Sequence, residues 1–89
     1  MKALTQFKRR SLFGYDEVVS VYKCNGYYNV GQYKGPMSHG FFNIFEHEYL
    51  YTQLDRALEA GEQDTFNLLI EERIRDDEST ALYICGGTI

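Results

Sequence analysis

Residues 17–34, EVVSVYKCNGYYNVGQYK, predict a β-hairpin. This is the clearest secondary-structure prediction that the sequence allows. β-Branched and aromatic residues, which favour strands, lie on both sides of Asn25-Gly26. An Asn-Gly pair favours a two-residue type I′ turn, because both central residues of that turn need a positive φ. This turn fixes four facing pairs, the last with opposite charges: Cys24 with Tyr27, Lys23 with Tyr28, Val21 with Val30, and Glu17 with Lys34.

Side chains alternate along a strand, so the hairpin has two faces, and both are partly apolar. One face carries Val19, Val21 and Val30. The other face carries an aliphatic residue, a cysteine and three tyrosines, namely Val18, Cys24, Tyr22, Tyr27 and Tyr33. Either the hairpin is central and covered on both sides, or one face is buried and the other presents tyrosines to a partner.

The segments beside the hairpin are less regular. Residues 2–8 (KALTQFK) fit a neighbouring strand or a short helix. Gly35-Pro36 ends the second strand, because proline cannot continue a central ladder, and residues 35–40 are therefore expected to form a loop. Phe41-Phe42 fits a short strand or the hydrophobic staple of a following helix.

Two helices are predicted next. Apolar residues recur every three or four positions from Ile44 to Leu58, and Asn43 with Glu46 has the spacing of a capping box. Gly61 stands where a glycine often follows a helix. A second helix is predicted over residues 62–76, and a short final strand over residues 81–85.

This order predicts an α+β domain, in which a small antiparallel sheet, formed by the Asn-Gly hairpin and the C-terminal strand, packs against two consecutive helices. Eighty-nine residues suffice for one hydrophobic core, so residues 1–89 are expected to form a single domain. The chain lacks an apolar run as long as a membrane span and an apolar signal region near its start, so we expect a cytoplasmic protein that does not contact membranes. Cys24 and Cys85 are expected to be free thiols.

Charge is distributed very unevenly along the chain. Residues 1–35 hold six basic and two acidic side chains, whereas residues 36–89 hold three basic and eleven acidic ones. A small domain with this pattern is an electric dipole, which influences partner choice and association rate rather than fold.

The residues that usually carry catalysis or bind metals are few and have no recognisable spacing. The chain has no HExxH and no CxxC motif, so a zinc site would require His39, His47, Cys24 and Cys85 to converge without a motif. We therefore expect no catalytic residue, no metal and no cofactor, and interpret the chain as a non-enzymatic protein.

The leading hypothesis is a small protein-binding module, an inhibitor or adaptor of the kind that viruses and mobile elements often encode. Its acidic helices would dock on a basic surface of a partner protein, and its hairpin tyrosines would provide an apolar anchor or a surface for homo-oligomerisation. The acidic residues expected at this interface are Glu59, Glu62, Glu71, Asp76, Asp77 and Glu78, and the tyrosines are Tyr22, Tyr27 and Tyr33.

Two alternatives use other residues. A nucleic-acid-binding regulator would bind phosphates through Lys8, Arg9, Arg10, Lys23 and Lys34 and stack bases on the hairpin tyrosines. A pI near 5.0 argues against a dedicated nucleic-acid binder. A protein that sequesters a small ligand would need a pocket between hairpin and helices, near His47 and Tyr51.

Overall fold

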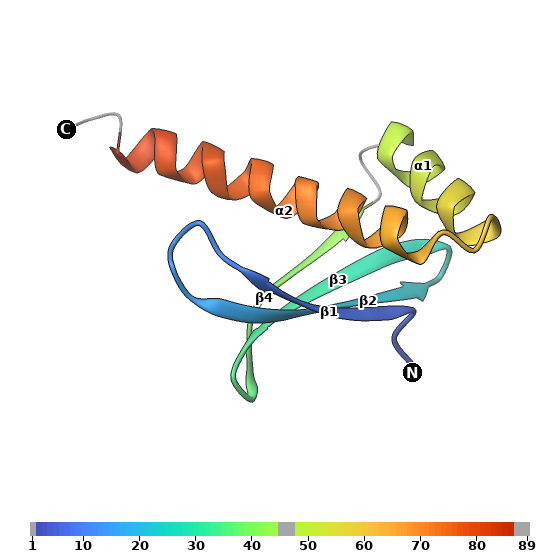
Figure 1. The fold of residues 1–89 in the computed structure, drawn as a ribbon, viewed down its shortest axis with the longest axis horizontal. Coiled ribbons are helices and arrows are strands. Elements are labelled where there is room, and N and C mark those ends of the chain that lie inside the picture. Colours follow the sequence, from blue (N-terminus) through green and yellow to red (C-terminus); the bar gives the residue numbers. More distant parts are fainter. Residues whose placement is uncertain (1, 45–47, 87–89) are drawn as a thin grey trace.

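Four antiparallel strands form one sheet in the order β1-β2-β3-β4, so each strand pairs with its neighbour in the chain. The structure is a computed structural model, and it describes residues 2–44 and 48–86. Two helices follow the sheet and lie on the same side of it (Figure 1). The elements are β1 (Thr5–Arg10), β2 (Asp16–Cys24), β3 (Tyr27–Lys34), β4 (Met37–Ile44), α1 (Glu48–Glu59) and α2 (Gln63–Gly86). The predicted α+β class is confirmed.

The predicted hairpin is confirmed as β2 and β3. Asn25 and Gly26 have φ values of 53° and 81°, as a type I′ turn requires. Three of the predicted pairs are present in this register: Cys24 with Tyr27, Lys23 with Tyr28, and Val21 with Val30.

The predicted charge pair at the far end of this hairpin is wrong. Glu17 binds Arg9 of β1 instead, and Nζ of Lys34 lies 4.6 Å from the centroid of the Tyr15 ring. The reason is burial, because the Glu17 side chain faces the helices and needs a cation that is buried with it.

Residues 35–40 do not form the predicted loop. Gly35 takes a φ of 69° and Pro36 completes a tight turn, so the chain reverses and continues as β4. Proline in the turn costs the sheet no hydrogen bond, which is why it does not end the sheet here. Phe41 and Phe42 lie within β4, and residues 5–10 form β1, so the strand alternative holds for both segments.

The predicted C-terminal strand is also wrong, because residues 81–85 continue α2 as far as Gly86. Ser79-Thr80 does not break the helix, since the Thr80 hydroxyl donates a 3.0 Å hydrogen bond to the backbone carbonyl of Asp76 one turn earlier. The fourth strand is therefore β4, and it is formed by residues that precede both helices.

The first helix begins later than predicted and ends as predicted. Asn43 belongs to β4 and cannot cap a helix, while Glu46 lies outside the described residues. At the other end Gly61 has a φ of 71°, and the amide of Glu62 donates to the carbonyl of Ala57 across 2.9 Å. These are features of a Schellman motif, which turns the chain directly into α2.

The hydrophobic core lies between the sheet and the two helices. Val19, Val21, Tyr28 and Val30 contribute from the sheet, and Leu54, Ala57, Phe66, Ile70 and Ile74 contribute from the helices. The opposite face of the sheet is not covered by any described element (Figure 1). We call it the open face. The strand register places Tyr22, Tyr27 and Tyr33 on it, so one hairpin face is buried and the other presents its tyrosines.

Candidate functional site

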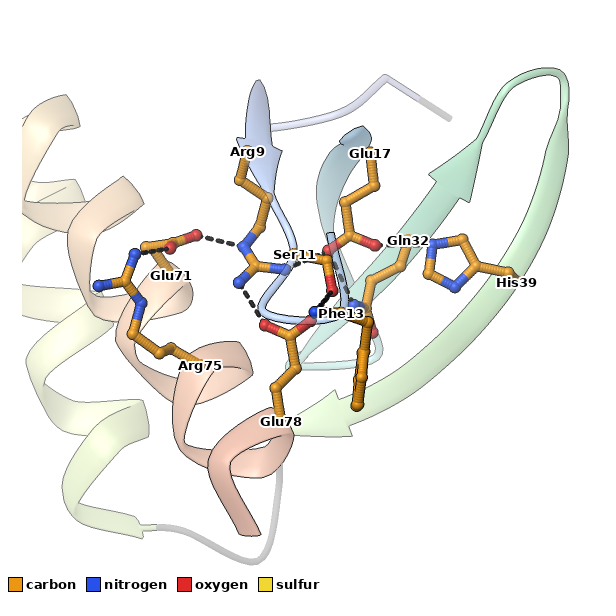
Figure 2. Close-up of polar contacts among 9 residues, drawn as sticks. All are labelled: Arg9, Ser11, Phe13, Glu17, Gln32, His39, Glu71, Arg75 and Glu78. Atoms are coloured by element: carbon orange, nitrogen blue, oxygen red, sulfur yellow. Dashed lines mark hydrogen bonds and ion pairs between the residues drawn. The ribbon is translucent and has the colours of Figure 1, made fainter. Parts of the chain in front are cut away.

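Buried charged residues join the sheet to α2. Arg9 and Glu17 face each other on β1 and β2, and their side chains point toward the helix layer. Glu71 and Glu78 are two helical turns apart on one side of α2, so both carboxylates reach the Arg9 guanidinium (Figure 2). Each of these three glutamates accepts a hydrogen bond from a different nitrogen of Arg9, which matches the fork of donors that a guanidinium presents.

We call Arg9 and its three glutamates, Glu17, Glu71 and Glu78, the ion cluster. A second set of contacts surrounds it. The Ser11 hydroxyl donates to Glu78, and Nε2 of Gln32 donates to Oε1 of Glu17 across 3.1 Å. Nε2 of His39 lies 2.6 Å from Oε2 of Glu17, a buried oxygen that receives no well-aligned hydrogen bond. His39 reaches this side of the sheet because the β3–β4 register shifts between Gln32 and Tyr33, as a β-bulge does.

The contacts favour the charged forms of Glu78 and Arg9. Burial alone would raise the pKa of the Glu78 carboxyl, but hydrogen bonds from Arg9 and Ser11 outweigh it and hold that pKa below its ordinary range. Burial likewise opposes the charged form of Arg9, and the three glutamates outweigh it, so the pKa of the guanidinium is raised. The cluster therefore holds α2 against β1 and β2 as a paired structural element.

The predicted exposure of two residues, Glu78 and Arg9, is wrong. Glu78 was expected on an exposed acidic face, but its residue surface is only 7% exposed. Arg9 was expected to bind phosphates, and it is also only 7% exposed. Glu71 is half-buried and binds both Arg9 and Arg75, so it is largely neutralised.

The other predicted acids are exposed, and two of them line a groove between α1 and α2. The groove has a volume of about 630 Å³, and its apolar lining comes from Tyr49, Leu50 and Leu69. Its charged lining comes from Glu72, Arg73, Asp76 and Asp77. Glu59 and Glu62 are exposed but lie outside this groove.

The groove has unbalanced negative charge. Arg73 donates to the Asp77 carboxylate from its Nε, at 3.2 and 3.3 Å, so these two side chains neutralise each other. Within the described residues, the carboxylates of Glu72 and Asp76 have no ion-pair partner. They are four residues apart and lie on one side of α2, next to exposed Tyr49.

The open face, with its tyrosines, and the α1–α2 groove lie on opposite sides of the molecule. Tyr22, Tyr27 and Tyr33 point away from the helices, whereas Glu72 and Asp76 belong to the helix layer. A single flat partner surface cannot contact both, so the combined interface expected from the sequence is not assembled on one side of this fold.

The predicted basic residues are also divided. Lys8 and Arg10 lie on the open face, where they line a recess of about 530 Å³ together with Val18 and Tyr33. Lys23 faces the helices and binds Asp55 at 3.2 Å, and Lys34 lies over Tyr15. Three of the five predicted cations therefore line one recess, and one of them, Arg9, is already paired with three glutamates.

The ligand pocket expected near His47 and Tyr51 is not apparent at Tyr51. The Tyr51 hydroxyl donates to the carbonyl of Gly26, and its ring centroid lies 5.2 Å from that of Tyr28. Tyr51 thus ties α1 to the hairpin turn. His47 lies outside the described residues.

Sequence reasoning missed Glu72, Tyr49 and Leu50 as candidate binding residues. The spacing of Glu72 and Asp76 was a usable signal, because residues four apart share one side of a helix. The spacing does not show where α1 lies, and α1 forms the other wall of the groove beside these acids.

Comparisons of this chain with protein-family models, with curated proteins and with solved structures find no match. Among the described residues, neither helix is both long and apolar enough to cross a membrane.

Proposed function

We propose that this chain is a non-enzymatic cytoplasmic binding module whose α1–α2 groove holds a basic segment of another protein. The observation that carries this proposal is the pair of unneutralised carboxylates, Glu72 and Asp76, beside an apolar lining of Tyr49, Leu50 and Leu69. A segment that offers lysine or arginine next to one large apolar residue would satisfy both parts of the groove.

Electrostatics gives this groove an advantage in finding such a partner. The acids are concentrated in the helix layer, so a basic segment is attracted before contact, and the association rate falls as salt screens the charges. By covering a basic surface that another ligand needs, the module would act as an inhibitor or an adaptor.

The test is capture of partners from a nuclease-treated extract of the native host at low salt. The groove variant Glu72→Gln/Asp76→Asn is compared with Glu59→Gln/Glu62→Gln, which removes the same two charges outside the groove. We expect a captured protein to be lost with the groove variant and retained with the control variant, while circular dichroism shows that both variants are folded. Equal loss with both variants would mean that binding depends on overall negative charge and not on the groove. No loss with either variant would contradict the proposal.

A second candidate function is supported by the recess on the open face. Lys8 and Arg10 supply two cations there, and the Tyr33 ring offers a surface on which a base can stack. Asp16 lies 3.6 Å from Arg10 in this recess and opposes phosphate binding, which is why we rank this function second. Fluorescence anisotropy with a labelled oligothymidylate at low salt tests it: binding that disappears in Lys8→Gln/Arg10→Gln supports it, and no binding by the native chain contradicts it.

A further inference from the structure

The two edges of the sheet differ in how they are protected. β1, at one edge, carries Lys8, Arg9 and Arg10 within its six residues, and α2 packs against it through Thr5–Asn67 and Arg9–Glu71 hydrogen bonds. β4, at the other edge, reads MSHGFFNI and contains no lysine, arginine, aspartate or glutamate. In the described part of the chain no strand pairs with its outer side.

Free sheet edges bind other strands readily, so soluble proteins usually block them with charges, proline, bulges or a covering element. β4 has one such feature, the bulge near His39, and Pro36 precedes the strand. From Gly40 to Ile44 the pairing with β3 is regular, and no described residue supplies such a feature there. This uncharged segment, which we call the β4 edge, includes Phe41, whose surface is 61% exposed.

We propose that the β4 edge pairs antiparallel with the β4 edge of a second copy of this chain, so that two four-stranded sheets form one continuous sheet. When the two-fold axis passes through Phe41, the facing side chains of the two copies are compatible on both faces of the sheet. On the open face the two Phe41 side chains lie side by side, and on the helix face Gly40 of one copy lies opposite Phe42 of the other. A phenyl ring beside a glycine is a favourable cross-strand pair, because the ring covers backbone that the glycine leaves exposed.

Self-complementarity argues for a second copy as the occupant. Pairing this uncharged segment with itself brings no like charges together, although the chain carries a net charge of −4. The same operation centred on Arg9 of β1 would place Lys8, Arg9 and Arg10 of two copies against one another, which is destabilising. Pairing β4 with itself also leaves β1 at both outer edges, so the assembly closes at two copies.

Sedimentation equilibrium of the full chain over a range of concentrations tests this proposal. We expect a reversible dimer for the native chain and a monomer for Phe41→Lys, because the substitution places two cations beside each other at the axis. The control variant is Tyr27→Lys, which changes an exposed ring on the open face away from the β4 edge. A native chain that stays monomeric at all concentrations would overturn the proposal. So would a dimer that survives Phe41→Lys but is lost with Tyr27→Lys, since that pattern indicates stacking of open faces.

Disulfide trapping tests the register separately. In a Cys24→Ser/Cys85→Ser background, Phe41→Cys should form an intermolecular disulfide under mild oxidation, because residues at the axis face each other at a distance that a disulfide spans. Leu68→Cys, at an exposed position of α2, should not. Equal cross-linking of both variants would show random collision and contradict the proposed register.

Discussion

The same residue types have opposite roles on two sides of α2. Glu71 and Glu78 turn toward the sheet and bind the buried guanidinium of Arg9, whereas Glu72 and Asp76 line the α1–α2 groove and are not neutralised by any residue that the structure describes. One residue position, from Glu71 to Glu72, separates a structural carboxylate from one that has no ion-pair partner in the described part of the chain. An acidic helix is therefore not one surface, and its function depends on which acids the fold has already neutralised.

The largest effect is expected from Arg9→Met. This substitution leaves three carboxylates without their shared cation in a buried site, and removal of one partner from a buried ion pair costs about 3–5 kcal/mol of unfolding free energy. Urea unfolding measures the loss. Arg10→Met is the matched control on the neighbouring exposed position, and it should cause no comparable loss. If the two variants are equally stable, the ion cluster does not hold α2 to the sheet.

The next effect is a change in acid stability caused by Glu78. Its pKa is lowered in the folded state, so its contribution to stability is complete above its ordinary pKa of 4.5 and is lost as the pH falls through the folded-state value. Glu78→Gln should cost about 1–3 kcal/mol near neutral pH, because it leaves hydrogen-bond donors of Arg9 and Ser11 poorly paired. The thermal stability of Glu78→Gln should then fall less steeply than that of the native chain as the pH is lowered below 4.5. Asp76→Asn, at an exposed position in the groove, should cause no comparable loss near neutral pH, and an equal loss there would contradict the contrast between the two sides of α2.

A smaller effect is expected at Tyr28, a buried tyrosine of the sheet. Burial, followed by its hydrogen bond to Asp55, raises the pKa of this phenol, so its contribution to stability is complete below the ordinary value of 10.0 and is lost as the pH rises through the folded-state value. Tyr28→Phe should remove about 0.5–1.5 kcal/mol, the net value of one hydrogen bond. In a spectrophotometric titration the native chain should show a late-titrating phenol that is missing from Tyr28→Phe. Tyr49→Phe, at an exposed position, should retain that late phenol.

The smallest effect on stability is expected from Glu72→Gln, because that side chain is exposed and lacks an ion-pair partner among the described residues. Thermal unfolding should show no measurable change, although partner capture should weaken. A clear loss of stability would mean that Glu72, like Glu71, belongs to the structural framework.

The elements that could be predicted from the sequence are those specified by local chemistry. The Asn25-Gly26 turn fixes the β2–β3 register within a few residues, and Gly61 ends α1 through hydrogen bonds to its own last turn. The elements that could not be predicted depend on context. Residues 81–85 have strand-forming side chains, yet they continue a helix whose preceding turns are already packed on the sheet.

The candidate sites divide in the same way. Helix and strand periodicity accounts for the exposure of Asp76 and for the shared face of Tyr22, Tyr27 and Tyr33. The burial of Arg9 and Glu78 could not be anticipated, because these partners lie 69 residues apart and meet only when α2 crosses the sheet. Neither residue stands in a pattern that distinguishes it from an exposed charge.

The placement of both helices on one face of the sheet has a consequence for avidity. A two-fold axis that joins two β4 edges runs perpendicular to the sheet, so both copies keep their helices on the same side. Two α1–α2 grooves would then lie on the same side of one joined sheet. A partner with two basic segments, or two partners held together, could bind bivalently, and the second contact would form at the high effective concentration that the first one creates.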